Sequence, residues 1–562
     1  MSMADALSIV IAQINPTVGD LDRNVDAVLA VWREAAGIRA DLVVAPELCI
    51  TGYPPEDLVM RPAFDAAVRE RLDRIVRATS AGGPGLLVGC PWRDEKDGRL
   101  YNAAVLVHEG TIVVRQYKHD LPNYTVFDEK RVFAAGPLPA PVLFRGAKLG
   151  VLVCEDMWSP PVAAALKKGG AEILVVINAS PFDINQQADR AAAAALRVKE
   201  TALPLLYVNQ VGAQDELVFD GDSFAMNADG KVIARTKSFR ADKMVTGWRK
   251  TGAKWQCAPA TVALHAGTEE ATYQALMLGL RDYTAKNGFE GVLLGFSGGI
   301  DSGLTAAIAA DALGADNVHC VMLPFDYTSR ESLDDAAACA SALGVRYAAI
   351  PIAPAVNAFN AMLRGVFAGR SADLTEENLQ ARARAVSLMA LSNKFGYLLL
   401  TTGNKSELAV GYATLYGDMA GGYSVLKDVY KTNVYKLARW RNTRVPESGQ
   451  GPAGAVIPER MLTKEPTAEL KAHQKDSDAL PPYDVLDDIL RGLVEEELPV
   501  ADIVKAGHKL PTVIKVEALL YGAEYKRRQA APGVRVTRRA FGRDRRYPIT
   551  NRFREGPTPG RK

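Results

Sequence analysis

The stretch Val292-Leu-Leu-Gly-Phe-Ser-Gly-Gly-Ile-Asp-Ser-Gly-Leu304 decides the fold of the second half of this chain. An apolar strand, expected over 291–296, runs directly into Ser297-Gly-Gly299, and an alanine-rich helix is expected to begin at about Ser302. Glycines let backbone N–H groups approach a ligand closely, and the N-terminus of the following helix carries partial positive charge. The sequence therefore predicts a phosphate-binding loop; the alternative is an ordinary glycine turn between a strand and a helix.

The residues of this loop distinguish it from other phosphate-binding loops. No Gly-Lys-Ser/Thr follows the glycines, so it is not a Walker A loop. The order Ser-Gly-Gly-Ile-Asp-Ser instead resembles the pyrophosphate loop of the ATP pyrophosphatases, enzymes that adenylate a substrate and release pyrophosphate. The resemblance implies that ATP binds at Gly295, Phe296, Ser297, Gly298, Gly299, Ile300, Asp301 and Ser302.

Further strands follow the loop, and each is expected to lead into a helix. Besides 291–296 they are expected over 318–323, 346–351 and 397–402. This alternation predicts an α/β domain of the doubly wound, Rossmann-like type with a parallel sheet, which binds ligands at the carboxyl ends of its strands. Residues 441–482 are rich in glycine, proline and charge, so we expect a mobile loop or lid there.

The first half of the chain, over residues 1–260, also alternates apolar strands with helical stretches. Strands are expected at 7–12, 41–46, 85–88, 103–107, 111–116, 149–154, 173–178 and 205–209, and helices at 23–36, 63–79, 161–168 and 188–202. The pattern predicts a separate α/β domain whose sheet is largely buried. The polar stretch 248–256, followed by Pro259 and Gly267, is interpreted as a linker, which gives domains over 5–262 and 270–562.

Composition sets broad limits. The chain has 562 residues, of which 48% are hydrophobic and 23% charged, with a formal net charge of +2. This balance supports several packed domains, argues against disorder and identifies no charged partner. The six cysteines form no C-x-x-C pair, the N-terminus lacks a basic region before its short apolar run, and no apolar run is long enough to span a bilayer. A cytoplasmic protein with reduced thiols is therefore expected.

Three reactive residues lie at the ends of predicted strands of the first half: Glu47, Lys118 and Cys154. Strands that run in one direction bring such residues to one pocket, and the three groups suit amide hydrolysis. Cys154 would attack the carbonyl, while Glu47 would take its proton and later activate water. Lys118 would keep the thiol reactive and stabilise the oxyanion. Taken singly, each has an ordinary alternative as a surface charge or a packing cysteine.

The contexts of these residues resemble the nitrilase-type carbon–nitrogen hydrolases over about residues 5–250. The matching pieces are Pro46-Glu-Leu48, Tyr117-Lys-His-Asp-Leu-Pro122 and Cys154-Glu-Asp-Met-Trp158. The resemblance implies a nitrilase-like α/β sandwich. Whether Glu129 assists as a second carboxylate is left open.

The combination of the two halves resembles one family, the bacterial glutamine-dependent NAD synthetases. The resemblance implies that the first half releases ammonia from glutamine and that the second uses ATP and Mg²⁺ to adenylate deamido-NAD. Ammonia would then displace AMP to give NAD. By the same analogy we expect an internal path for ammonia and a homo-oligomer, with small-molecule substrates and neither nucleic acid nor membrane as a partner.

The resemblance also implies roles for residues outside the loop. Thr402 and Lys431 would contact ATP; Asn378, Glu407 and Lys526 would contact deamido-NAD; Asp301 and Glu407 would hold Mg²⁺; Tyr124, Ser180 and Gln186 would bind glutamine. The alternative for the lysines and the asparagine is a solvated helix face. Gln186 departs from the lysine that relatives commonly carry, so its role is left open.

Other functions compatible with these motifs stay open at this point. One is an amidotransferase of the same ATP-pyrophosphatase class that acts on another carboxylate or nucleotide, and a second is a tRNA-modifying enzyme. A third is a binding protein built on two inactive domains. The basic segment 526–562 is interpreted as a packed tail rather than a nucleic-acid arm, because aromatic residues, a proline and Asp544 interrupt it.

Overall fold

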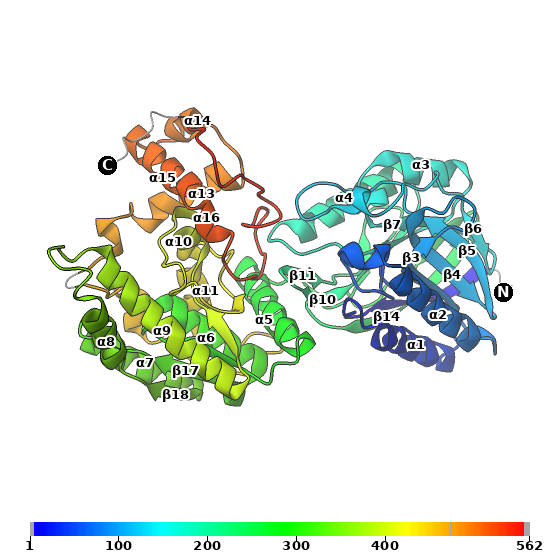
Figure 1. Cartoon of the computed structure of the whole chain (residues 1–562). Helices are drawn as coiled ribbons and strands as arrows, with labels where there is room; N and C mark the ends of the chain where they lie inside the picture. The colour runs from blue at the N-terminus through cyan, green and yellow to red at the C-terminus, as the bar shows by residue number, and fades with distance from the viewer. Residues whose placement is uncertain (1–4, 472–473, 556–562) are drawn as a thin grey trace. The chain divides into compact units, whose positions relative to one another are not determined.

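The computed structural model describes residues 5–471 and 474–555 (Figure 1). Contacts between Cα atoms divide the chain into two compact units, with the boundary between Ala266 and Gly267. In the described part of the chain, no helix is both long and apolar enough to cross a membrane.

The first unit is built on two sheets that pack face to face. The strand order of one sheet is β15-β14-β1-β2-β3-β4-β5, and that of the other is β13-β12-β9-β8-β7-β6. Apolar side chains of both sheets form a common core, which includes Ile9, Val44, Val151 and Val175. This arrangement confirms the predicted nitrilase-like sandwich.

The strands of the first sheet are β1 (Ala6–Gln13), β2 (Leu42–Val44), β3 (Gly85–Arg93), β4 (Leu100–His108), β5 (Thr111–Tyr117), β14 (Asp242–Thr251) and β15 (Lys254–Cys257). The strands of the second are β6 (Val142–Phe144), β7 (Ala147–Val153), β8 (Ile173–Asn178), β9 (Leu205–Asn209), β12 (Phe224–Met226) and β13 (Val232–Arg235). A separate hairpin pairs β10 (Val211–Gln214) with β11 (Leu217–Asp220).

Helices cover the outer faces of the two sheets (Figure 1). On the first sheet lie α1 (Leu21–Gly37) and α2 (Pro62–Thr79), and on the second lie α3 (Pro160–Lys168) and α4 (Gln186–Thr201). Each helix buries one apolar stripe, as Val25, Leu29 and Trp32 do on α1. The resulting four layers leave the carboxyl ends of β2, β5 and β7 free to carry functional residues.

The predicted linker at 248–256 is wrong. Residues 242–251 form β14, which pairs antiparallel with β1, and 254–257 form β15 at the edge of the sheet. The segment reads as polar because one face of this edge hairpin is exposed, while Trp248 and Trp255 on the other face are each only 1% exposed. The chain leaves the first unit only after this hairpin.

The second unit contains a five-stranded sheet in which every pair of neighbouring strands is parallel. The strands are β16 (Val292–Gly295), β17 (Val318–Met322), β18 (Arg346–Ala349), β19 (Leu398–Thr401) and β20 (Tyr423–Ser424), in the order β18-β17-β16-β19-β20. The chain moves outward from β16 on one side and then returns to continue from β19 on the other. This topology confirms the doubly wound prediction and puts its switch point between β16 and β19.

The helices of this sheet are α5 (Thr268–Lys286), α6 (Ile300–Leu313), α7 (Arg330–Leu343), α8 (Ala353–Leu363), α9 (Leu374–Phe395), α10 (Lys405–Val410) and α11 (Lys431–Thr443). Helix α6 begins at Ile300, two residues earlier than expected, so that Asp301 and Ser302 belong to its first turn. Residues 441–482 are not a continuous loop, because they include the end of α11 and the short helix α12 (Glu459–Thr463).

The C-terminal part of the second unit packs around a core of its own. Helices α13 (Tyr483–Val494), α14 (Val500–Lys505) and α15 (Leu510–Gly522) supply most of that core, and the short α16 (Glu524–Arg527) follows them. The basic residues that follow are partly buried and paired: Arg545 with Glu524 at 3.2 Å and Arg535 with Asp544 at 2.8 Å. Over the residues described, up to 555, this segment is the packed tail expected from the sequence.

Candidate active sites

The first candidate site brings together Glu47, Lys118 and Cys154 at the carboxyl ends of β2, β5 and β7. Glu47 and Lys118 are completely buried, and Cys154 is 4% exposed. The Lys118 ammonium donates to Glu47 Oε1 at 2.7 Å and to Glu129 Oε1 at 2.9 Å. Glu47 and Lys118 both act electrostatically on the Cys154 thiol, so the three groups lie near one another.

Neighbouring residues hold the Glu47 carboxylate on both oxygens. Asn102 Nδ2 donates to Oε1 at 2.7 Å, and the backbone N–H of Ala179 donates to Oε2 at 2.9 Å. Tyr53 donates its hydroxyl to Glu129 Oε1 at 3.0 Å and so fixes the second carboxylate. Because these donors come from several strands and loops of the unit, the site is preorganised without substrate.

The backbone at Cys154 is also specialised. Cys154 has φ of 45°, a left-handed conformation that costs free energy in a residue other than glycine, and it starts a short 3₁₀ turn, Cys154–Met157. The buried Asp156 carboxylate accepts from the backbone N–H groups of Val153 at 3.0 Å and of His119 at 2.9 Å. Asp156 therefore joins the turn after Lys118 to the turn that carries Cys154.

Burial and the neighbouring charged groups together determine the protonation states of the side chains in this site. Burial, reinforced by Glu47, raises the pKa of the Cys154 thiol well above its ordinary value, although Lys118 acts in the opposite direction. Burial opposes the charged form of Lys118, but Glu129 and Glu47 outweigh it and keep the pKa of the ammonium well above its usual range. Burial raises the pKa of Glu129 to about 7 despite Lys118. The resting thiol is therefore neutral and needs a base at the moment of attack.

The residues expected to bind glutamine lie around this triad. Tyr124 donates its hydroxyl to Glu155, the neighbour of Cys154, at 2.9 Å. Ser180 follows Ala179, whose N–H binds Glu47, and Gln186 Nε2 donates to Ser180 Oγ at 3.3 Å. Gln186 therefore faces the site, but as a neutral group.

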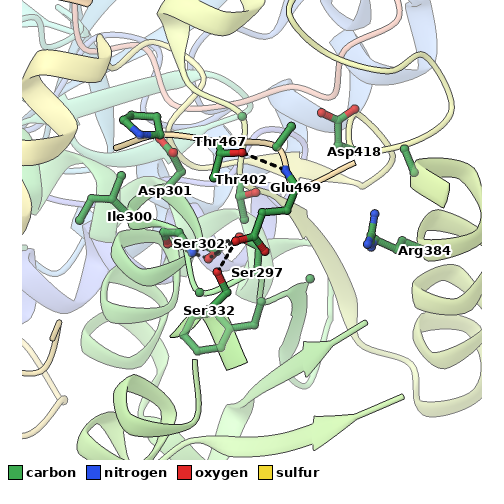
Figure 2. A pocket seen from close by; sticks show the side chains of 18 of the residues that line it. Ser297, Ile300, Asp301, Ser302, Ser332, Arg384, Thr402, Asp418, Thr467 and Glu469 are labelled. Carbon is green, nitrogen blue, oxygen red and sulfur yellow. Dashed lines mark hydrogen bonds between the residues drawn. The ribbon is translucent and has the colours of Figure 1, made fainter. Parts of the chain in front are cut away.

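The second candidate site is a cavity of about 310 Å³ at the switch point of the parallel sheet. It is lined by all of Gly295–Ser302, by Thr402, Glu407 and Lys431, and by residues 464–470 (Figure 2). Gly298 has φ of +80°, and a Cβ there would lie 2.2 Å from the carbonyl oxygen of Ser332. Only glycine fits this close approach. The loop and the first turn of α6 both line the cavity, which is the arrangement that an anion site uses.

One lysine and two carboxylates form the charged wall of this cavity. The Lys431 ammonium bonds to Asp301 and lies 3.1 Å from Glu407 Oε1, while Asn404 Nδ2 donates to Asp301 Oδ1 at 2.8 Å. Burial raises the pKa of Glu407 to about 7, against the effect of Lys431. Two hard carboxylate donors beside a phosphate-binding loop suit Mg²⁺, which commonly takes one or two carboxylates together with nucleotide phosphates.

Asn378 and Lys526 do not line this cavity directly. Asn378 on α9 accepts from the hydroxyl of Thr414, a lining residue, at 2.9 Å. The Lys526 ammonium is bonded to the carbonyl oxygens of Gly411 at 2.8 Å and Ala413 at 2.6 Å. Both residues are therefore held at the margin of the cavity.

Several residues of these sites were missed by sequence reasoning, namely Asn102, Tyr53, Asn404, Arg384 and Glu469. Asn404 could have been found, because it follows Thr402-Gly403 at the end of a predicted strand. The others are distant in sequence from the residues that they contact, so no local pattern marks them.

Comparisons with known proteins define the class of each half. The family model for carbon–nitrogen hydrolases matches residues 9–247, and the one for NAD synthases matches residues 272–530. The chain is thus a fusion of a nitrilase-type hydrolase with an NAD synthase, and the second class consists of ATP-using ligases.

Relatives that match this chain over nearly its full length identify the family within this class. The glutamine-dependent NAD(+) synthetase of Rhodobacter capsulatus is 49% identical, covering 98% of this chain and 100% of its own length. That of Thermotoga maritima is 43% identical over 98% of this chain and 99% of its own. The structure of glutamine-dependent NAD+ synthetase from Acinetobacter baumannii in complex with ADP matches with a TM-score of 0.76 and 42% identity, over 97% of this chain and 99% of that one. The chain belongs to the family of glutamine-dependent NAD(+) synthetases.

Proposed function

We propose that this protein hydrolyses glutamine to glutamate and ammonia, adenylates deamido-NAD with ATP, and amidates it to give NAD, AMP and pyrophosphate. The observation that carries the proposal is the presence of both machineries in one chain. The buried Glu47–Lys118–Cys154 triad suits amide hydrolysis, and the cavity at Gly295–Ser302 suits a nucleotide. The family membership and the ADP bound by the Acinetobacter relative support the use of ATP.

In the first half-reaction, the Cys154 thiol attacks the side-chain amide of glutamine. Because this thiol is neutral at rest, Glu47 takes its proton as the bond to carbon forms and gives it to the departing ammonia. Lys118, held in its charged form by Glu47 and Glu129, stabilises the developing oxyanion. Glu47 then activates the water that releases glutamate. Tyr124, Ser180 and Gln186 orient the substrate.

In the second half-reaction, the loop over 295–302 and the start of α6 hold the phosphates of ATP while the nicotinate carboxylate of deamido-NAD attacks the α-phosphorus. Lys431 and Thr402 contact the nucleotide, and Asn378, Glu407 and Lys526 contact deamido-NAD. Asp301 and Glu407 are the residues that would hold Mg²⁺, which neutralises phosphate charge when bound. Ammonia then attacks the acyl adenylate and AMP leaves.

The direct test is an assay with purified protein, deamido-NAD, ATP and Mg²⁺, in which glutamine and ammonium are compared as nitrogen sources. Both should give NAD with AMP and pyrophosphate in equal amounts, and glutamine should also give one glutamate per NAD. Failure to form NAD from either source would overturn the proposal. Amidation of another carboxylate in place of deamido-NAD would instead favour a related amidotransferase.

The same proposal includes domains over 5–262 and 270–562, a cytoplasmic location, a homo-oligomeric assembly and an internal path for ammonia. It is supported by analogy with the family. Sedimentation of the purified protein measures the oligomeric state. Dilution of ¹⁵N from labelled glutamine by unlabelled ammonium shows whether ammonia follows an internal path.

A further inference from the structure

The first turn of α11, which carries Lys431, is held by side chains from two other helices. The backbone N–H of Lys431 donates to Ser406 Oγ at 2.9 Å, and the backbone N–H of Thr432 donates to Asp487 Oδ2 at 2.9 Å. The first N–H groups of a helix have no partner within the helix, so these two bonds satisfy groups that would otherwise stay unpaired. They also fix the backbone from which the Lys431 ammonium extends to the charged wall of the nucleotide cavity.

Asp487 joins the two helices that supply this wall. Its carboxylate accepts from the Ser406 hydroxyl through Oδ1 and from the Thr432 N–H through Oδ2. Ser406 precedes Glu407 in the first turn of α10. Thr432 follows Lys431 in the first turn of α11. One carboxylate therefore links the two helix starts that carry Glu407 and Lys431, whose charged atoms are 3.1 Å apart.

Asp487 belongs to a stripe of three residues on α13 that contact the start of α11. Tyr483, Asp487 and Arg491 follow one another at intervals of four residues, which puts them on one face of the helix. The Lys431 ammonium lies 5.3 Å from the centre of the Tyr483 ring. Arg491 donates to Thr432 Oγ1 at 3.2 Å. The stripe therefore contacts both the backbone of this turn and the ammonium itself.

Asp487 acts from outside the cavity. Asp487 and Ser406 are both completely buried. Among the described residues, the lining of the cavity includes Lys431 but neither Asp487 nor Ser406. A buried carboxyl is unfavourable unless its oxygens are hydrogen-bonded, and both oxygens of Asp487 are. Asp487 can therefore influence the reaction only through the residues that line the cavity.

We propose that Asp487 is a positioning residue for adenylation, which fixes the first turns of α10 and α11 so that Lys431 reaches the phosphates of ATP in the geometry that the reaction needs. The inference rests on the proposed function, because Lys431 is assigned to the nucleotide there. As the nicotinate carboxylate attacks the α-phosphorus, the bond from this phosphorus to the bridging oxygen breaks, and pyrophosphate leaves with the electron pair. Lys431 stabilises the charge on the phosphates only when its ammonium is in place, and a displacement of about 1 Å can lower a rate on the order of 10²-fold.

The test measures pyrophosphate release with deamido-NAD, ATP and saturating ammonium, so that the first site takes no part. Asp487→Ala removes the acceptor of two hydrogen bonds and should lower kcat by roughly 10–100-fold. Asp487→Asn can still accept from the Thr432 N–H and can donate to Ser406 Oγ, so its rate should return to within severalfold of the wild type. Asp488→Ala is the matched control, because Asp488 is the next residue on α13, is exposed and lies 2.7 Å from His508. It should keep the rate of the wild type.

A double-mutant cycle separates positioning from a general structural role. Lys431→Met removes the ammonium, and pyrophosphate release by this slow variant can be followed with radiolabelled ATP. In that background, Asp487→Ala should lower the remaining rate by less than about twofold, because the group through which Asp487 acts is gone. A purely structural role would lower the rate by the same factor in both backgrounds.

Several results would overturn the inference. One is an unchanged rate in folded Asp487→Ala, and another is an equal loss in both backgrounds of the cycle. A rate in Asp487→Asn as low as in Asp487→Ala would show that these hydrogen bonds are not what matters. If Asp487→Ala does not fold, Ser406→Ala removes the hydroxyl that joins Asp487 to the Lys431 N–H and decides the question by the same cycle. A wild type that releases no pyrophosphate would instead refute the proposed function.

Discussion

The two candidate sites both place one lysine between two carboxylates, and the comparison between them is instructive. Lys118 lies between Glu47 and Glu129, and Lys431 lies between Asp301 and Glu407. We call each set of one lysine and two carboxylates a trio. In each trio, burial raises the pKa of one carboxyl, Glu129 or Glu407, to about 7, because a single ammonium cannot compensate for two buried negative charges.

The surroundings of the two trios differ. In the first, the ammonium and Glu47 are completely buried and every contact is supplied by the protein. In the second, the trio borders a cavity of about 310 Å³ whose lining also includes the glycine loop and the polar segment 464–470. Covalent attack on a small neutral amide needs a dry, preset network. Adenylation needs room for two large anions and a way to close over them.

Among the substitutions that should affect one site and not the other, Asp301→Ala is expected to have the largest effect on activity. Removing this carboxylate should lower pyrophosphate release by roughly 10³, the order seen when a main electrostatic contributor is lost, because Lys431 loses its partner and Mg²⁺ would lose a ligand. NAD formation from glutamine and from ammonium should fall together. The variant should still hydrolyse glutamine, since the first trio is untouched. Near-normal pyrophosphate release would remove Asp301 from the catalytic set.

A smaller effect is expected from Gly298→Ala, which tests the loop backbone. The new Cβ would meet the Ser332 carbonyl oxygen, and φ of +80° is unfavourable for alanine. A strain of about 1–3 kcal/mol corresponds to roughly 5–160-fold lower kcat/KM for ATP. Gly288→Ala is the control, because Gly288 has φ of +75° with no heavy atom within 4 Å of the added Cβ. Equal losses in both variants would show that the positive φ alone, and not the close approach of the Ser332 carbonyl oxygen, explains why position 298 needs glycine.

The smallest effect concerns the protonation of Cys154. Because burial and Glu47 raise the pKa of this thiol, its thiolate fraction at pH 7 is small and grows only as the pH rises. Alkylation of Cys154 by iodoacetamide should therefore be slow at pH 7 and faster at alkaline pH, as followed by peptide mass spectrometry. Glu47→Gln removes a negative charge and should speed alkylation severalfold at a given pH. Rapid labelling of the wild type that does not depend on pH would contradict the neutral resting thiol.

The sequence predicted what depends on local pattern. Ser297–Ser302 was recognisable because a phosphate-binding loop needs its glycines, strand and helix in consecutive order. Glu47, Lys118 and Cys154 were recognisable because each ends an apolar strand. The doubly wound, parallel type of sheet around β16 followed from the alternation of strands and helices, whereas its strand order came only from the structure.

What the sequence did not predict depends on contacts between distant segments. The hairpin of β14 and β15 was taken for a linker, since an edge with one exposed face has the composition of a loop. Glu469 gave no signal, because its partners Ser329 and Ser332 lie about 140 residues away and only the fold brings them together. The neutral thiol was also missed: Lys118 alone favours the thiolate, and only the structure shows that burial and Glu47 outweigh it.

The central claim is that nitrogen is released at the first site and used at the second. The most direct test supplies wild type and Cys154→Ala with glutamine labelled with ¹⁵N in its side-chain amide, together with excess unlabelled ammonium, deamido-NAD, ATP and Mg²⁺. The wild type should place mostly label in the amide of NAD. Cys154→Ala should form NAD from ammonium at a rate close to that of the wild type, without label. Label in the NAD of the variant, or no NAD from a folded variant, would contradict the division of chemistry between the two sites.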